Sequence, residues 1–202
     1  LSSLNLAFHH DDLFVQVPAQ ASLEHPVRLV RYVSARAQQA FFPLTVIHVG
    51  AGSTVTLIDE YVSRNTEASG HPHLINGRIE LVLEADAAVR YVRLQRWDRA
   101  AREFLLQRAT LGRGASLTLA NINLGAALSK AHVVAKLAGE YASTKLYGFV
   151  CGHDAQHTQQ LWCKGRPFRD DALCGHFASF GQLSVNGDLL SHPLDFARDG
   201  RR

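Results

Sequence analysis

The stretch TVIHVGAGSTVTLIDEYV, residues 45–62, decides the fold. Apolar side chains stand at every second position on both sides of the short turn GAGS, which is typical of strands that bury one face. The turn lacks the Asn-Gly or Asp-Gly pair that marks a two-residue hairpin. The stretch therefore predicts two strands joined by a turn, and it leaves open whether they pair with each other or with strands elsewhere.

The same form recurs along the chain, as an apolar residue, a short turn of Gly, Ala or acidic type, and a small residue that leads into a new strand. The copies are VPAQASL (17–23), VGAGSTV (49–55), LEADAAV (83–89), LGRGASL (111–117) and LAGEYAS (137–143), and their starts are 32, 34, 28 and 26 residues apart. Units of this size, too small to bury their own faces, are typical of a solenoid of stacked coils. A sandwich or barrel of antiparallel hairpins is the alternative.

Nearly the whole chain follows this strand pattern, and only RLVRYVSARAQQA (28–40) has a pattern that would suit a helix. The sequence therefore predicts an all-β fold. The 202 residues, 47% of them apolar and 19% charged, predict one globular domain over residues 1–202. The chain starts at Leu1 and contains no Met. These two features suggest a fragment or a sequence with residues missing.

Charge and hydropathy narrow the class of partner. The net charge is +3 and the arginines are spread along the chain, apart from the tail ARDGRR, so no basic stripe predicts nucleic-acid binding. No apolar run approaches the 18 or so residues of a membrane span, and no signal-peptide pattern opens the chain. We therefore expect a cytoplasmic protein that binds neither nucleic acid nor membrane.

The three cysteines, Cys151, Cys163 and Cys174, are widely spaced and form no C-x-x-C pair. Neither a disulfide framework nor a closed four-cysteine zinc site is predicted. Cys174 and His176 stand two residues apart, with Asp170 and Asp171 upstream. In a strand such residues share a face, which suits a common site and suits a buried structural pair equally well.

Two imidazoles and a carboxylate form another candidate metal site, as His71 and His73 are followed by Glu80. These are reasonable ligands for a divalent transition metal, and their order loosely resembles the first motif of cupin enzymes. Glu80 comes later than that motif places it, and the second cupin motif has no counterpart. A loop with exposed histidines is the competing interpretation.

Other polar clusters predict less. FHHDDLFVQVP, with His9, His10, Asp11 and Asp12, is typical of a solvated turn before the first strand. CGHDAQHTQQ, with Cys151, His153 and His157, matches no closed metal site and is typical of a polar loop. No Gly-x-Ser-x-Gly elbow and no phosphate-binding loop before a helix is present.

As an ordered series, the coils resemble the SufB/SufD family of iron–sulfur cluster assembly proteins, and SufD-like members most. The series consists of DDLFVQVPAQASLEHPVRLV (11–30), TVIHVGAGSTVTLIDEYVS (45–63), NGRIELVLEADAAVRYVRLQRW (76–97) and NLGAALSKAHVVAKLAGEYASTKLYGFV (123–150). Matching single positions are Asp59, Glu60, Tyr61, Asn76, Glu80, Tyr91 and Gln95. The similarity runs over residues 5–150, whereas residues 151–202 are shortened and divergent.

The resemblance implies a right-handed parallel β-helix and a non-catalytic role in SUF-type assembly, in complex with a SufB-like protein and a SufC-like ATPase. The family carries a pattern Asp-Asp-x-x-Cys-x-His near the end of its β-helix, and DDALCGH (170–176) supplies it here, followed by FGQL. The resemblance thus implies that His176, with Cys174 beside it, lies at the interface with the SufB-like partner, where a transient iron–sulfur cluster forms.

The chain departs from the family in two ways. Only about twenty residues separate YGFV from DDALCGH, where the family spends several more coils, and the family's N-terminal and C-terminal helical regions have no counterpart. The C-terminal region is the part that docks on the ATPase. Two alternatives therefore stand beside the assembly role: a β-helical interaction module that dimerises through its strand edges, and a cupin-like enzyme that uses His71 and His73.

Overall fold

A computed structural model describes residues 2–10, 12–34, 39–63, 72–151, 157–165, 178–181, 183–185 and 188–190 of the chain. Two parallel sheets make up most of it, preceded by the short helix α1 (Ser2–Phe8). No helix in these ranges is long and apolar enough to cross a membrane.

Sheet A contains, in spatial order, β1 (Leu13–Val17), β4 (Leu44–Val49), β6 (His73–Leu83), β8 (Ala101–Leu111), β10 (Leu128–Leu137) and β12 (His157–Gly165), with β3 (Ala40–Phe41) also paired to β6. Sheet B contains β2 (Val27–Val33), β5 (Thr54–Ser63), β7 (Ala88–Arg96), β9 (Ser116–Asn123), β11 (Ser143–Val150) and β13 (Ala178–Gly181). A small antiparallel pair, β14 (Leu183–Val185) and β15 (Asp188–Leu190), follows.

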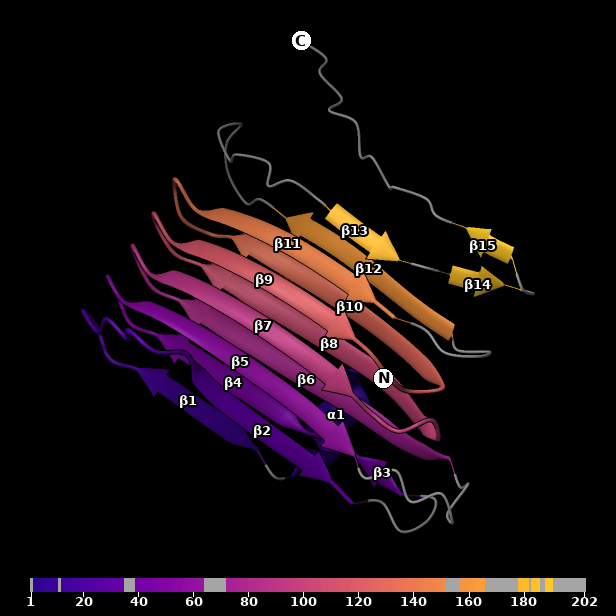
Figure 1. Cartoon of the computed structure of the whole chain (residues 1–202). Helices are drawn as coiled ribbons and strands as arrows, with labels where there is room; N and C mark the ends of the chain where they lie inside the picture. Colours follow the sequence, from indigo (N-terminus) through magenta and orange to yellow (C-terminus); the bar gives the residue numbers. More distant parts are fainter. Residues whose placement is uncertain are drawn as a thin grey trace.

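From β4 onward the chain alternates between the two sheets, so that each coil adds one strand to each (Figure 1). Every pairing within sheets A and B is parallel. The fold is therefore a β-solenoid, which confirms the all-β prediction and excludes the sandwich of hairpins. Local alternation could not decide this, because a strand has the same pattern in parallel and antiparallel sheets.

Each repeat in the sequence corresponds to one coil of the stack. The apolar residues that begin the five turns pair in succession across sheet A: Val17 with Val49, Val49 with Leu83, Leu83 with Leu111, and Leu111 with Leu137. All five are buried. The unequal spacings in the sequence thus measure the lengths of successive coils. We call these five side chains the apolar ladder, and it holds the coils in register.

The turns after this ladder also stack. One residue in each turn has a left-handed backbone: Gln20, Gly52, Asp86, Gly114 and Tyr141. The amide nitrogens of the first four donate to a carbonyl oxygen in the turn of the next coil, at 2.7–2.9 Å. Only Gly adopts this conformation without a penalty from its side chain, so the hydrogen bonds between coils sustain it at Gln20 and Asp86.

The segment that suited a helix is a strand. Residues 27–33 form β2, which pairs along its whole length with β5, so the helical interpretation of residues 28–40 is wrong for this part. Arg28, Val30 and Tyr32 face outward and alternate with residues that face the interior. Pairing with an existing strand outweighs the weak helical preference of the sequence.

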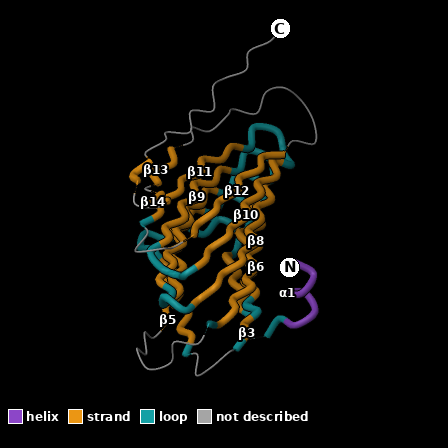
Figure 2. The backbone as a smooth tube through the Cα atoms, turned by 90° about the vertical axis from the view of Figure 1, so that its right-hand side faces the viewer, coloured by secondary structure: helices purple, strands orange, loops and turns teal. Residues whose placement is uncertain are grey.

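Helix α1 is the one helix that the structure describes, and the periodicity did not predict it. It lies against the outer face of sheet A beside β6 (Figure 2). Its buried Asn5 donates from Nδ2 to the carbonyl oxygens of Pro43, at 3.1 Å, and Asn76, at 2.6 Å. The rings of Phe8 and Phe42 lie 5.7 Å apart. Tertiary contacts therefore position this seven-residue helix, which is too short to be stable alone.

Candidate functional site: a buried polar network

The interior of the solenoid has an apolar part and a polar part. Next to the stacked turns it is filled mainly by Val, Ile, Leu and Ala. Farther along the strands lies an interior polar network, which we define as Arg31, Thr45, Asp59, Tyr61, Tyr91, Arg93, Gln95, Trp97, Glu103, Gln107, Asn121, Asn123 and Ser129. These side chains come from both sheets and project between them.

The centre of the network is the ion pair between Arg93 and Glu103, which joins sheet B to sheet A. Arg93 is 0% exposed and also donates from Nη1 to Asn123 Oδ1 at 3.2 Å. Glu103 accepts two further hydrogen bonds, from Trp97 Nε1 at 2.8 Å and from Ser129 Oγ at 2.9 Å. Burial lowers the pKa of Arg93, but the charge of Glu103, together with smaller contributions from Tyr61, Tyr91 and Asp59, outweighs burial and raises that pKa overall.

Asp59 forms the second anionic centre. It accepts hydrogen bonds from the phenol groups of Tyr61, at 2.8 Å, and Tyr91, at 2.5 Å. Burial, and then the negative charge of Asp59, raise the pKa of both phenols, so they remain protonated donors at any physiological pH. The guanidinium groups of Arg31 and Arg93 lie 5.6 and 4.9 Å from the centre of the Tyr61 ring. Two cations thus balance two anions in the interior.

Several polar atoms of the network lack a hydrogen-bond partner: Arg93 Nε, Gln107 Nε2, Asn121 Oδ1 and Asn123 Nδ2. Gln107 and Asn121 contact each other across the interior, with Asn121 Nδ2 donating to Gln107 Oε1 at 2.9 Å. Such buried atoms are usually satisfied by internal water. The charged groups of the network are engaged with one another and with neighbouring hydroxyl, indole and amide groups, so its geometry supports a role in holding the two sheets together.

Glu60 is next to Asp59 in the sequence but lies on the outer face of sheet B. There it is paired with Arg28 and with Arg96, whose Nη1 is 2.7 Å from the Glu60 carboxylate. The hydrogen bond from Arg28 is the main reason that the pKa of Glu60 is lowered. Because the folded-state pKa is the lower one, this contact stabilises the fold at neutral pH and is lost as the pH falls through that pKa.

The buried Ser63 of β5 and His73 of β6 meet the partly buried Asp98, which follows β7. Ser63 Oγ donates to Asp98 Oδ2 at 2.7 Å, and the Asp98 amide nitrogen donates to Ser63 Oγ at 2.6 Å. His73 Nε2 lies 3.5 Å from the same Asp98 oxygen. The serine hydroxyl is therefore bound to the aspartate and not to the histidine. This is not the arrangement that activates a serine nucleophile.

The structure separates two of the residues proposed as cupin-like metal ligands. On β6, His73 faces the interior, where it meets the Phe41 ring edge to face, whereas Glu80 faces outward and pairs with Arg78 at 2.5 Å. Seven residues of strand also place them roughly 23 Å apart. His71 lies outside the described residues, so the complete set stays untested as a site.

Cys174 and His176, together with Asp170 and Asp171, also lie outside the described residues, between β12 and β13 in the sequence. Cys151 follows β11 as a free thiol, and its amide nitrogen donates to the carbonyl oxygen of Asn123 at 2.9 Å. His9 and Asp12 form an exposed contact at 2.6 Å. Within the described ranges, no three His, Cys, Asp or Glu side chains are grouped so that they could hold a metal ion.

Sequence reasoning did not identify the interior polar network as a site. A signal exists, because Asp59, Arg93 and Glu103 occupy positions of the strand alternation that should be buried and apolar. Charged residues at such positions are rare unless they are paired. The alternation could therefore have identified the residues, although which side chains they pair with becomes apparent only after folding.

Gln95 joins the network to the segment between β9 and β10. It donates from Nε2 to the carbonyl oxygen of Gly125 at 3.1 Å and accepts from the Gly125 amide at 2.9 Å. A Cβ at Gly125 would lie 1.9 Å from the backbone oxygen of Trp97. Backbone, unlike the end of a side chain, has little room to move away.

We therefore expect Gly125→Ala to lower the free energy of unfolding by about 1–3 kcal/mol, the cost of overpacking a filled site. Gly77→Ala is the matched control, because its Cβ would meet only the methyl end of the Leu105 side chain, at 3.3 Å. Urea unfolding followed by circular dichroism measures both. Equal losses for the two variants would contradict the close approach at Gly125.

The fold and the site define the class of protein: it is a parallel β-solenoid whose interior contains buried, mutually paired charges. The family follows from comparison with known sequences. The family model described as "SUF system FeS cluster assembly, SufBD core domain" matches residues 32–162, from β2 to β12, and the chain belongs to this family. This supports a role in SUF iron–sulfur cluster assembly. Neither the curated proteins nor the solved structures that were compared gave a match.

Proposed function

We propose that the protein is a non-catalytic, SufD-like scaffold component of SUF-type iron–sulfur cluster assembly that works in complex with a SufB-like protein. The observation that carries the proposal is the family match, which coincides with the coils from β2 to β12. The interior supports a scaffold role, because its charged groups are engaged with one another and join the two sheets.

Within this proposal, Cys174 and His176 are the residues that meet the nascent cluster. A thiolate is the usual ligand of iron–sulfur clusters, and imidazole replaces it at some irons. Two ligands cannot complete a cluster, so the partner would supply the others. The cluster is the cargo of the complex, held transiently and shared between the two proteins. A SufC-like ATPase is the further proposed partner.

The test is anaerobic cluster reconstitution on the full chain together with a SufB-like protein and a SufC-like ATPase. We expect His176→Ala to lower the iron and sulfide recovered per complex by about tenfold, the effect of removing a group that holds or supports a metal. His25→Ala, which removes an exposed histidine elsewhere, is the matched control and should leave the yield unchanged. Size-exclusion chromatography shows whether each variant still forms the complex.

Equal iron and sulfide for His176→Ala and His25→Ala in an intact complex would refute the site. A complex that forms but never holds a cluster, even with the parent chain, would instead support the alternative of an interaction module without cluster function. A chain that forms no complex but dimerises would favour association through its strand edges.

A further inference from the structure

The outer face of sheet A carries a row of exposed cations along β8 and β10. These are Arg102, Arg108, Lys130 and Lys136. None of them forms an ion pair with a carboxylate within the part of the chain that the structure describes. Glu80 of β6 is in register with Arg108 but is paired with Arg78. The row therefore carries an excess of positive charge.

Apolar side chains lie beside Arg102, Arg108 and Lys130 and beside His132, whereas Lys136 lies beside Thr110. The pairing of β8 with β10 places Arg102 beside Leu128, Lys130 beside Phe104, His132 beside Leu106, and Arg108 beside Val134. Successive steps along a strand on one face are about 6.7 Å apart. The face thus repeats one basic and one apolar group over four consecutive steps, a strip roughly 20 Å long. We call it the β8–β10 strip.

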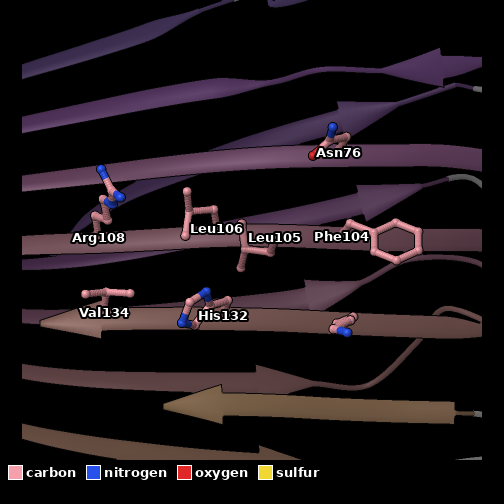
Figure 3. Close-up of a pocket in the computed structure, with 8 residues that line it drawn as sticks. Asn76, Phe104, Leu105, Leu106, Arg108, His132 and Val134 are labelled. Carbon is pink, nitrogen blue, oxygen red and sulfur yellow. The ribbon is translucent and has the colours of Figure 1, made fainter. Parts of the chain in front are cut away.

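The strip is hollowed. A cavity of about 360 Å³ lies over its middle, with Asn76 at its β6 side (Figure 3). The other residues that line it are Phe104, Leu105, Leu106, Arg108, Lys130, His132 and Val134. Leu106 and His132 lie side by side on neighbouring strands in this view. An apolar floor with cations at its rim suits a ligand that is itself apolar on one side and acidic on the other.

The same face already holds a helix. Helix α1 lies on β6, and its Asn5 donates to the carbonyl oxygen of Asn76, the residue that also borders the cavity. The outer face of sheet A therefore accommodates a helix at one place, and the β8–β10 strip is the adjoining place. Helix α1 has no charged residue in its sequence SSLNLAF, and Asn5 anchors it by hydrogen bonds to the backbone. A helix on the strip would instead meet charged side chains.

We propose that the β8–β10 strip is a docking site for an acidic amphipathic helix of a partner protein. Four residues of helix rise about 6.0 Å, close to the 6.7 Å between steps of the strip. Carboxylates spaced four residues apart would then face successive basic residues, and the apolar residues beside them would enter the cavity. A strip of roughly 20 Å accepts nearly four turns of helix. The inference does not depend on the proposed role in cluster assembly.

Charge favours this occupant over a second copy of the chain, because the chain has a net charge of +3 and its described helix has no acidic residue. The cavity floor favours a helix over single-stranded nucleic acid, because aliphatic side chains make up most of that floor. Nucleic acid would require a series of stacked aromatic platforms, whereas the cavity lining holds one phenyl ring, Phe104, and one imidazole, His132.

The probe is a fluorescently labelled peptide of about 16 residues, with Glu at every fourth position, Leu after each Glu and Ala elsewhere. Fluorescence anisotropy measures its binding to the full chain. We expect the charge reversals Arg108→Glu and Lys130→Glu, made together, to weaken binding about tenfold or more. The matched control is Arg90→Glu with Lys145→Glu, which reverses two exposed cations on the outer face of sheet B. It should leave binding within about twofold.

A scrambled peptide of the same composition should bind the parent chain about as weakly as the original peptide binds the β8–β10 variant. Circular dichroism confirms that both double variants keep the fold. Equal weakening by the two double variants would show an effect of net charge alone and would overturn the proposal. So would tighter binding of a single-stranded oligonucleotide that depends on the same two residues.

Discussion

Replacing Glu103 with leucine is expected to lower the free energy of unfolding by about 3–5 kcal/mol, the cost of leaving a buried charge without its partner. Arg93 is 0% exposed, so its guanidinium cannot turn to solvent. Trp97 and Ser129 would lose their acceptor as well. Urea unfolding at neutral pH, followed by circular dichroism, measures the loss.

A double-mutant cycle separates the charge effect from lost packing. Adding Arg93→Met to Glu103→Leu removes the stranded cation, so the double variant should recover about 1 kcal/mol or more relative to Glu103→Leu alone. Simple addition of the two losses would contradict the interpretation of Arg93 and Glu103 as a coupled pair.

An exposed ion pair supplies the control for the same cycle. Arg113 and Asp86 lie 3.3 Å apart, with side chains 66% and 57% exposed. Arg113→Ala should change the free energy of unfolding by no more than about 0.5 kcal/mol, because solvent screens such pairs. A loss as large as that of Glu103→Leu would show that burial is not what makes the interior pair important.

Replacing Leu83 with alanine is expected to cost about 2–5 kcal/mol, the range for a leucine truncated in a packed core. Leu83 is 2% exposed and stands in the middle of the apolar ladder, between Val49 and Leu111. Backbone hydrogen bonds fix the spacing between this coil and the coils above and below. The neighbouring coils therefore cannot move in to fill the cavity that the truncation leaves. Urea or thermal unfolding measures the effect.

The neighbouring residue on the same strand is the control. Val82 points to the opposite face of β6 and is 37% exposed. Val82→Ala should cost less than about 1 kcal/mol, because only part of its apolar area is removed from water on folding. If the two variants lost stability equally, the ladder would not be the element that holds the coils in register.

Much of the fold could be predicted from local features of the sequence. Alternation around GAGS and its four relatives predicts the strands, and the starts of these turns, such as Val49 and Leu83, turned out to be neighbours in sheet A. The prediction failed for residues 28–33, where pairing with β5 produced a strand, and it missed α1, which long-range contacts of Asn5 hold in place.

The candidate sites could be predicted less well. His73 and Glu80 are near each other in sequence, but strand alternation sends them to opposite faces. The assignment of Cys174 and His176 stays a prediction, because both lie outside the described residues. The interior polar network was missed, since each of its members looks like an isolated polar residue until the coils are stacked.

What the sequence determined by itself is the repeating unit: its alternation, its turns and the unequal spacings of 32, 34, 28 and 26 residues are all local properties. Only the tertiary structure decided which side chains meet across coils. Arg93 reaches Glu103, ten residues further along the chain, because β7 and β8 lie in opposite sheets and both side chains point between them. Arg108 lies beside Val134 on the outer face because parallel pairing joins residues about one coil apart. Coil lengths vary, so these partners follow from the register of the folded chain, which the buried apolar ladder sets.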